Sequence, residues 1–408
     1  MTEADPTTAA ELYRIPQQIQ RAEVRLRKRE GGTPPKAATA ILTFYKDRSR
    51  AVGDFQKLKY LERLPVVARA LGPEFLKPTV STARRFLTAF SGQEQSSVLT
   101  LKNVTEAFWR WMYARKGKEF PLALRIPVDR KLVKKKNHGD VLTPEDALAL
   151  ANHTRNQRDR AFVLVAWESG ARVSEMLLMR RADVEITGEG YVRLHLHREK
   201  GSDDVPVLLF EDSVPALMKW LEVLPSGDEG GAFLWVHVSG QSHRGRPITE
   251  RYALAMLKSS AKSADIQKKV HPHIFRHSRA THEAYNPKIP RSAYEAKFGW
   301  KPGSIVASRY IHGSGRDMEN AYRAAAGLPH RDQAPLAPPR VSRTCGRCKT
   351  VNPSGAKYCS TCAGPLTIEA AGEIEQQTTA ANRLRQLLED PSVMRYLARK
   401  LGGAGAKG

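Results

Sequence analysis

Residues 271–282 read HPHIFRHSRATH, and this stretch decides how the rest of the chain is interpreted. It holds a histidine and an arginine three positions apart, His273 and Arg276, followed by another histidine and small residues. Taken singly, such residues have ordinary explanations, because most arginines and turn lysines lie on the surface and most tyrosines pack. Three further stretches of the same region carry residues of similar interest: ESGARVSEMLLMRRADV (168–184), HREKGSDDVPV (197–207) and FGWKPGSIVASRYIH (298–312).

Taken together, these stretches supply what a tyrosine needs to attack a phosphodiester. Two arginines can hold the non-bridging oxygens, since the guanidinium fork matches phosphate and stays charged. A lysine can protonate the leaving alkoxide. A histidine can take or orient the phenol proton near neutral pH. The chain meets these needs without a metal through Arg172, Arg276, Lys200, His273 and Tyr310.

The same stretches resemble, in order, the sequence boxes of the tyrosine recombinases, the integrase family of site-specific DNA recombinases. GARVSEMLLMRRADV resembles the first arginine box, HPHIFRHSRATH the second, and FGWKPGSIVASRYIH the box of the nucleophilic tyrosine. The resemblance covers about residues 36–325. It implies the following roles: Arg172 and Arg276 clamp the phosphate, His273 takes or positions a proton, Lys200 is the general acid, and Tyr310 forms a 3′-phosphotyrosine link.

Two further residues receive roles from this resemblance. Glu175 matches the acidic residue that follows the first arginine and supports the site structurally. Trp300 stands where many relatives carry histidine, and its indole N–H can donate to the phosphate. The segment EKGSDDVPV around Lys200 departs from the commoner family pattern, which has further basic residues. A phosphotyrosine conserves the energy of the phosphodiester, so no ATP is required, and the sequence contains no Walker-type loop.

Residues 36–126 have helical periodicity throughout. Leu58, Leu61 and Leu64 fall on one side of a predicted helix, and Phe108, Trp111 and Met112 fall on one side of another. Basic residues opposite these faces predict a helical core-binding domain that contacts phosphates, although a solvated surface explains any single one of them. The candidate DNA-backbone contacts here and in the following linker are Lys57, Lys59, Arg110, Lys134, Lys135 and Lys136.

Residues 142–328 have a mixed pattern. A helix is predicted after LTPED, where Thr143 caps and Pro144 takes the first helical position. Helices then alternate with a hairpin-like pair at residues 191–197 and 205–210. We therefore predict a mainly α chain with a small β-hairpin or sheet, in which this region is an α+β catalytic domain.

The remaining segments flank these two domains. The predicted parts are an N-terminal helical arm (1–35), a basic linker (127–141), a proline-rich linker (329–342), a zinc ribbon (343–366) and a C-terminal helical tail (367–408) broken at Pro391. The arm is either a solvated charged helix or a DNA contact. The tail is either an independent helix or a partner-binding one.

The four cysteines of the chain all lie within 18 residues. Cys345 and Cys348 form one C-x2-C pair, and ten residues later Cys359 and Cys362 form another. This spacing predicts a structural zinc site with four thiolates, which leaves no position for a reactive water. Disulfide pairing is the alternative, and a cytoplasmic setting disfavours it. The ribbon could bind DNA or a protein partner.

The charge of the chain points to an anionic partner. It has 408 residues with 66 Lys and Arg against 42 Asp and Glu, a net charge of +24, and a pI near 10.0. Nucleic acid fits such a balance, because neutralised phosphates release counterions. No run of about 18 apolar residues and no signal-peptide core appears. We expect a cytoplasmic, nucleoid-associated protein without membrane contacts.

These observations predict an enzyme. The resemblance implies a site-specific recombinase that cleaves and rejoins double-stranded DNA attachment sites, integrating or excising a mobile element or viral genome. It also implies a homo-oligomer, a tetramer on synapsed DNA, with accessory DNA-bending proteins as further partners. The alternatives are a regulatory or architectural DNA-binding protein that keeps the fold without turnover, and a topoisomerase activity without synapsis.

Overall fold

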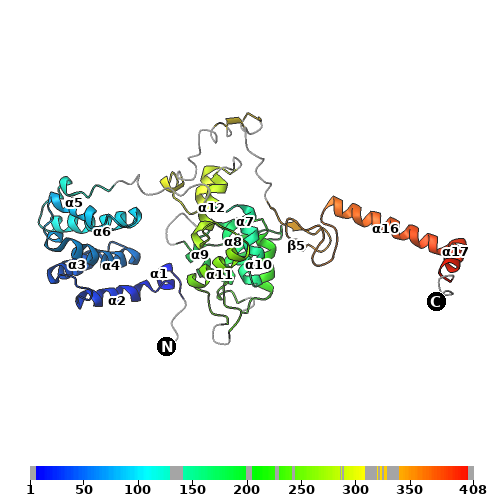
Figure 1. The fold of residues 1–408 in the computed structure, drawn as a ribbon, viewed down its shortest axis with the longest axis horizontal. Coiled ribbons are helices and arrows are strands. Elements are labelled where there is room, and N and C mark those ends of the chain that lie inside the picture. The colour runs from blue at the N-terminus through cyan, green and yellow to red at the C-terminus, as the bar shows by residue number, and fades with distance from the viewer. Residues whose placement is uncertain are drawn as a thin grey trace. The chain divides into compact units, whose positions relative to one another are not determined.

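The computed structural model divides the chain into two compact units, Met1–Asp140 and Val141–Gly408 (Figure 1). It describes residues 6–128, 141–198, 205–225, 229–240, 244–284, 286, 289–307, 319, 322–323, 326–328 and 340–402, with the side chains of 397–402 excepted. Lys200, Tyr310, Lys134, Lys135 and Lys136 lie outside the described residues. Each unit is considered by itself.

The first unit is built from helices. These are α1 (Ala9–Leu12), α2 (Ile15–Arg27), α3 (Pro35–Arg48), α4 (Asp54–Leu71), α5 (Val80–Ala89) and α6 (Gln95–Ala114), with short 3-10 turns at Gly72–Phe75 and Leu122–Leu124. In their core Phe75 stacks on Phe108 with ring centroids 4.7 Å apart. The indole of Trp109 donates to the Phe75 carbonyl at 2.9 Å. Buried aromatic contacts thus join α6 to the turn after α4.

Helix α2 belongs to this bundle. Its residues Ile15, Ile19, Ala22 and Leu26 are buried in the same core as those of α3, α4 and α6. Their spacing places them on one helical face, and that face finds its partners within the unit. The prediction of a separate arm over residues 1–35 is therefore wrong for residues 15–27.

The second unit combines helices with two small sheets. Its helices are α7 (Pro144–Asn152), α8 (Gln157–Ser169), α9 (Val173–Leu178), α10 (Ser213–Glu222), α11 (Glu250–Ser263), α12 (Pro272–Ala284), α13 (Arg291–Lys297), α16 (Ile368–Glu389) and α17 (Pro391–Gly402). A short 3-10 turn spans Arg181–Asp183. Its strands are β1 (Val184–Ile186), β2 (Val192–Leu194), β3 (Val207–Leu209), β4 (Arg343–Thr344) and β5 (Val351–Asn352).

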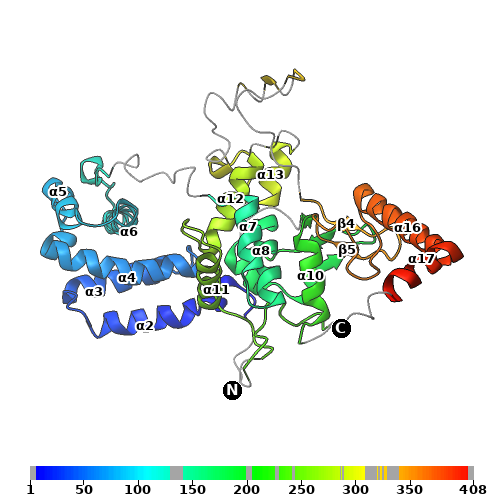
Figure 2. The ribbon, with the colours of Figure 1, turned by 45° about the vertical axis from the view of Figure 1, so that its right-hand side comes forward.

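Helix α8 is the centre of this unit and packs against α7, α10 and α12 (Figure 2). Its segment FVLVAW is apolar all round, as is typical of a helix buried on every side. The helix begins at the Asn156 cap and ends at Gly170, which is left-handed. Thr143 caps α7 with Pro144 in its first turn, which confirms the predicted helix start.

The three-stranded sheet has the order β1-β2-β3 and is antiparallel throughout. Leu194 pairs with Val207 and Val192 with Leu209, so the predicted hairpin pair is confirmed. Strand β1, which was not predicted, adds a third member. The chain is mainly α-helical with small antiparallel sheets, as its sequence predicts. Within the described ranges, no helix combines the length and apolar character needed to cross a membrane.

Candidate active site and cysteine cluster

Arg172 stands at the sharp turn between α8 and α9. The turn is made by Gly170, whose φ is +59° and whose missing Cβ would lie 2.5 Å from the Phe298 ring. A side chain at position 170 would therefore be strained by the backbone conformation and would displace the Phe298 ring. Glu175 holds the arginine in place, because its carboxylate accepts from the Arg172 backbone N–H at 2.8 Å and from Nη1 at 2.5 Å. The Arg172 side chain remains 38% exposed.

Arg276, on α12, is only 4% exposed and joins three segments of the chain. Its Nη1 donates to the Gly170 carbonyl at 3.1 Å, and its Nη2 donates to the Phe298 carbonyl at 2.5 Å. The guanidinium carbon also lies 5.3 Å from the Phe298 ring centroid and 5.4 Å from that of Trp300. The first arginine box, the second box and the start of the tyrosine box therefore meet at this side chain.

Trp300 contributes to the site as a wall. It is 7% exposed and stacks on Phe298 with ring centroids 4.9 Å apart and an interplanar angle of 20°. Both rings lie within 5.4 Å of the Arg276 guanidinium carbon, where cation–π attraction stabilises the charge. Phe298 was not among the predicted site residues. Its place beside Gly299 and Trp300 in the tyrosine box is the only sequence signal for it.

The other predicted site residues are only partly described. His273 is exposed on α12, three positions before Arg276 and therefore on the same side of the helix. Lys200 and Tyr310 lie outside the described residues, so their roles stay predictions.

The predicted DNA-backbone contacts of the first unit lie on its helices. Lys57 pairs with Asp54 at 2.7 Å, and Lys59 is exposed. Arg110 lies over Phe120, 5.2 Å from the ring centroid, and 3.8 Å from the Glu106 carboxylate. Phosphate binding by the exposed Lys59 stays a prediction. At Lys57 and Arg110, the ion pairs with Asp54 and Glu106 would compete with phosphate binding.

A buried ionic network, also absent from the predicted site, lies beside α12. Glu168, at the end of α8, accepts from the backbone N–H groups of Phe210 and Glu211 and from the Ser213 hydroxyl. Arg279, one turn beyond Arg276, donates to Glu211 at 2.9 Å and to Glu283 at 2.5 Å. The network thus ties the helix that carries Arg276 to the end of β3 and to the helix that precedes Arg172.

Burial makes Glu168 a pH-sensitive member of this network. Desolvation, with the nearby Glu211 carboxylate, raises the pKa of Glu168 to about 7. The raised pKa means that the folded protein favours the protonated form. Protonated Glu168 therefore contributes to the free energy of unfolding. This contribution is fully present below the ordinary pKa of about 4.5 and is lost as the pH rises toward 7.

We expect Glu168→Gln to remove this pH dependence, because an amide mimics the protonated carboxyl. Urea unfolding of both proteins between pH 4.5 and 8 checks it. The free energy of unfolding of the wild type, relative to the variant, should fall as the pH rises to about 7. A difference that stays constant over this range would contradict the assignment.

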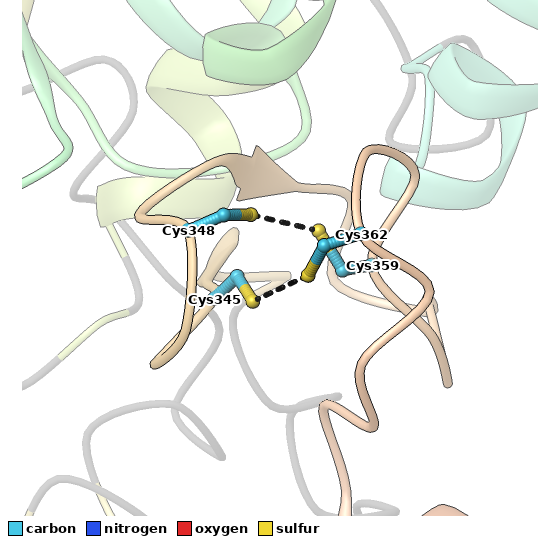
Figure 3. A group of neighbouring side chains, drawn as sticks. All are labelled: Cys345, Cys348, Cys359 and Cys362. Atoms are coloured by element: carbon cyan, nitrogen blue, oxygen red, sulfur yellow. Dashed lines mark hydrogen bonds between the residues drawn. The ribbon is translucent and has the colours of Figure 1, made fainter.

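The four cysteines converge on one point (Figure 3). Their sulfur atoms all lie within 4.8 Å of one another, with Cys345 3.6 Å from Cys362 and Cys348 3.5 Å from Cys359. These distances are far beyond a disulfide bond of about 2.05 Å. They approach the separation of about 3.8 Å that follows from tetrahedral zinc with bonds of about 2.3 Å. The donor set therefore fits a tetrahedral metal ion.

The two cysteine pairs lie in matching backbone turns. Lys349 N–H donates to the Cys345 carbonyl, and Ala363 N–H donates to the Cys359 carbonyl, each at 3.0 Å. Both residues adopt a positive φ, which closes the turn. Backbone N–H groups of Cys362 and Thr361 lower the pKa of the Cys359 thiol to about 6.

The second unit is similar to a known protein family. The model described as "Phage integrase family" matches residues 140–316. The tyrosine recombinase XerD of Corynebacterium glutamicum is 30% identical over 167 residues, which cover 41% of this chain and 49% of XerD. A tyrosine recombinase of Synechococcus elongatus is 32% identical over 145 residues, 34% of this chain and 44% of that protein. The chain spans about half the length of these relatives.

Solved structures show the same fold at lower identity. One is the XerH site-specific recombinase bound to a palindromic difH substrate (TM-score 0.52, 16% identity), matched over 80% of this chain and 98% of XerH. Another is the Tn1549 transposon integrase in complex with transposon right end DNA (TM-score 0.54, 16% identity), over 71% and 99%. Residues 140–316 therefore match the phage integrase family model, and the chain is similar in fold to these recombinase and integrase structures.

Proposed function

We propose that this chain is a site-specific DNA recombinase that cleaves and rejoins strands through a covalent link to Tyr310. The observation that carries the proposal is the convergence at Arg276. This residue of the second box contacts the turn that positions Arg172 and the wall formed by Phe298 and Trp300 in the box of Tyr310. A guanidinium held in this way is pre-organised to bind a phosphate.

In the proposed reaction, Arg172 and Arg276 bind the non-bridging oxygens of the scissile phosphate. The Tyr310 oxygen attacks phosphorus as His273 takes the phenol proton, and a new phosphorus–oxygen bond forms. The bond from phosphorus to the 5′ oxygen breaks, and Lys200 protonates that oxygen. Attack by the 5′ hydroxyl of another strand reverses these steps and rejoins the DNA. Trp300 donates its indole N–H to the phosphate as the charge builds.

The proposed substrate is a pair of double-stranded attachment sites, and the proposed role is integration or excision of a mobile element or viral genome. The net charge of +24 supports a polyanionic substrate. The matched XerH and Tn1549 integrase structures, which hold DNA by their descriptions, support the same kind of substrate. A tetramer on synapsed DNA, aided by DNA-bending proteins, and a place with the nucleoid in the cytoplasm belong to the same proposal.

The first unit, the basic linker and the cysteine ribbon each receive a role in this proposal. The helical first unit is proposed to act as the core-binding domain, with Lys57, Lys59 and Arg110 at the DNA backbone and the segment with Lys134, Lys135 and Lys136 as a basic strap. Cys345, Cys348, Cys359 and Cys362 are proposed to hold a structural Zn²⁺. With four thiolate ligands, the ion would crosslink the ribbon and take no part in the chemistry.

Trapping of the covalent intermediate tests the proposal. The substrates are nicked duplexes that cover the DNA flanking the gene. After cleavage, the short fragment that carries the free 5′ hydroxyl dissociates, so rejoining fails and the adduct accumulates. We expect a denaturant-stable protein–DNA adduct, with DNA on the tryptic peptide 310–316, and none with Tyr310→Phe.

Three outcomes would contradict the proposal. DNA binding without any adduct would instead support a regulatory or architectural protein. Relaxation of supercoiled plasmid without recombinant products would support a topoisomerase. An adduct that persists in Tyr310→Phe would move the nucleophile to another residue.

A further inference from the structure

The cysteine ribbon does not stand apart from the recombinase domain. Ser342, just before β4, donates through its backbone N–H and its hydroxyl to the Phe210 carbonyl, at 2.8 and 2.9 Å. Val341 forms a β-bridge with Glu211, and strand β5 packs on α10. The ribbon therefore continues the edge where β3 leads into α10.

Asp212 is the polar centre of this contact. It is 7% exposed and accepts from Arg340 Nε at 3.1 Å and from the Ser354 backbone N–H at 2.7 Å. Arg340 precedes β4 and Ser354 follows β5, so one carboxylate binds both ends of the β4–β5 pair. A carboxylate buried to this degree is costly unless it is paired, and here the ribbon supplies an ion pair and a hydrogen bond.

A second contact fixes the ribbon against the sheet. Gly190, in the turn between β1 and β2, has φ +86°, and a Cβ there would lie 2.7 Å from Thr344 Oγ1 and 3.5 Å from Val351 Cγ2. The Thr344 side chain therefore lies so close to the Gly190 backbone that any other residue at position 190 would be strained and would displace it. This contact lies at the opposite end of β2 from the segment that leads toward Lys200.

The position of Ser354 depends on the cysteine cluster. Asn352, two residues earlier, is fully buried, and its Oδ1 accepts from the Ser360 N–H and hydroxyl at 2.9 and 3.0 Å. Its Nδ2 donates to the Thr350 carbonyl at 2.8 Å. Asn352 thus links the turn after Cys348 to the turn of Cys359. Separation of the two cysteine pairs would therefore loosen the hold of Ser354 on Asp212.

The contact also reaches the helix of the active site. Glu211, the neighbour of Asp212, pairs with Arg279 on α12, and its backbone N–H donates to the buried Glu168. Any movement of the β3–α10 junction therefore bears on α12, which carries His273 and Arg276.

We propose that the ribbon is a metal-dependent brace of the recombinase domain, docked on Asp212 and continued through Glu211 and Arg279 to α12. The inference rests on the proposed metal site and not on DNA cleavage. It assigns the ribbon a partner within its own chain, where the sequence left DNA and other proteins open.

Hydrogen exchange of the full chain without DNA tests the brace. Three samples are compared: the zinc-loaded wild type, the chelator-stripped wild type and zinc-loaded Asp212→Ala. We expect stripping to speed amide exchange about tenfold in residues 205–217 and 272–284, while α4 and α6 of the other unit keep their rates. Asp212→Ala should keep its zinc and show the same acceleration in residues 205–217 and 340–354.

Lys357→Ala is the matched control on the ribbon, because Lys357 pairs with Glu373 of α16 at 3.0 Å and not with the recombinase domain. It should exchange like the wild type in residues 205–217. Unchanged exchange there after stripping, or in Asp212→Ala, would overturn the brace, and so would a chain that binds no zinc. If removal of zinc unfolds the entire second unit, the exchange rates of zinc-loaded Asp212→Ala decide whether the ribbon braces the recombinase domain. Because the exchange experiment contains no DNA, its result does not depend on whether the chain cleaves DNA.

Discussion

Arg276→Lys is expected to slow DNA cleavage about 100- to 1000-fold, the loss typical of removing one pre-organised donor to a developing charge. Lysine keeps the positive charge, so the substitution tests the geometry of the guanidinium. The planar fork of Arg276 donates to the carbonyls of Gly170 and Phe298 and lies against Phe298 and Trp300. An ammonium group cannot reproduce this set of directions together with a phosphate.

The measurement is the single-turnover rate of adduct formation on a nicked duplex, together with the free energy of unfolding of each variant. Arg155→Lys is the control, because Arg155 is exposed in the loop between α7 and α8. It should cleave at the wild-type rate. If Arg276→Lys unfolds at the wild-type denaturant concentration and cleaves as fast as the wild type, Arg276 is a packing residue and no phosphate clamp.

The second large effect concerns stability. Arg279→Met is expected to lower the free energy of unfolding by about 3–5 kcal/mol, since it strips the cation from a buried network. Arg279 is 9% exposed, and its loss leaves Glu211 and Glu283 without their common partner. Lys297 still pairs with Glu283, so Glu211, which lies beside the buried Glu168, loses the most.

Arg385→Met is the matched control. Arg385 also forms an ion pair with a glutamate four residues later, Glu389 at 3.2 Å, but the two side chains are 80% and 66% exposed. Surface pairs of this kind contribute roughly 0–1 kcal/mol. Urea unfolding of both variants gives the comparison. If both variants lose the same free energy of unfolding, burial does not add to the stability that the Arg279 ion pairs provide.

The sequence predicted the fold class and the hairpin because both depend on local patterns. Val192 and Leu194 alternate with polar residues and pair with β3 as expected. The order of the boxes predicted which segments matter, and Arg172, Glu175, Arg276 and Trp300 lie in the segments that the structure brings together. The roles of Lys200 and Tyr310 remain predictions, since both lie outside the described residues.

What the sequence did not reveal depends on contacts between distant residues. Glu168 and Arg279 are more than 100 positions apart, and an acidic or basic residue looks the same in a sequence whether it is buried or exposed. The helical character of residues 15–27 was predicted, but their packing against α4 was not. The pairing of Asp212 with Arg340 spans 128 positions and crosses a proline-rich segment that looks like a linker.

This last contact bears on how the protein can be divided for engineering. The family domain ends at residue 316, which invites a shortened recombinase that omits the cysteine ribbon. Such a truncation would remove both partners of Asp212 and uncover the Phe210 carbonyl and the glycine turn at position 190. A minimal version of this protein should therefore retain the chain through the ribbon, because the boundary of the family model is not the boundary of the folded unit.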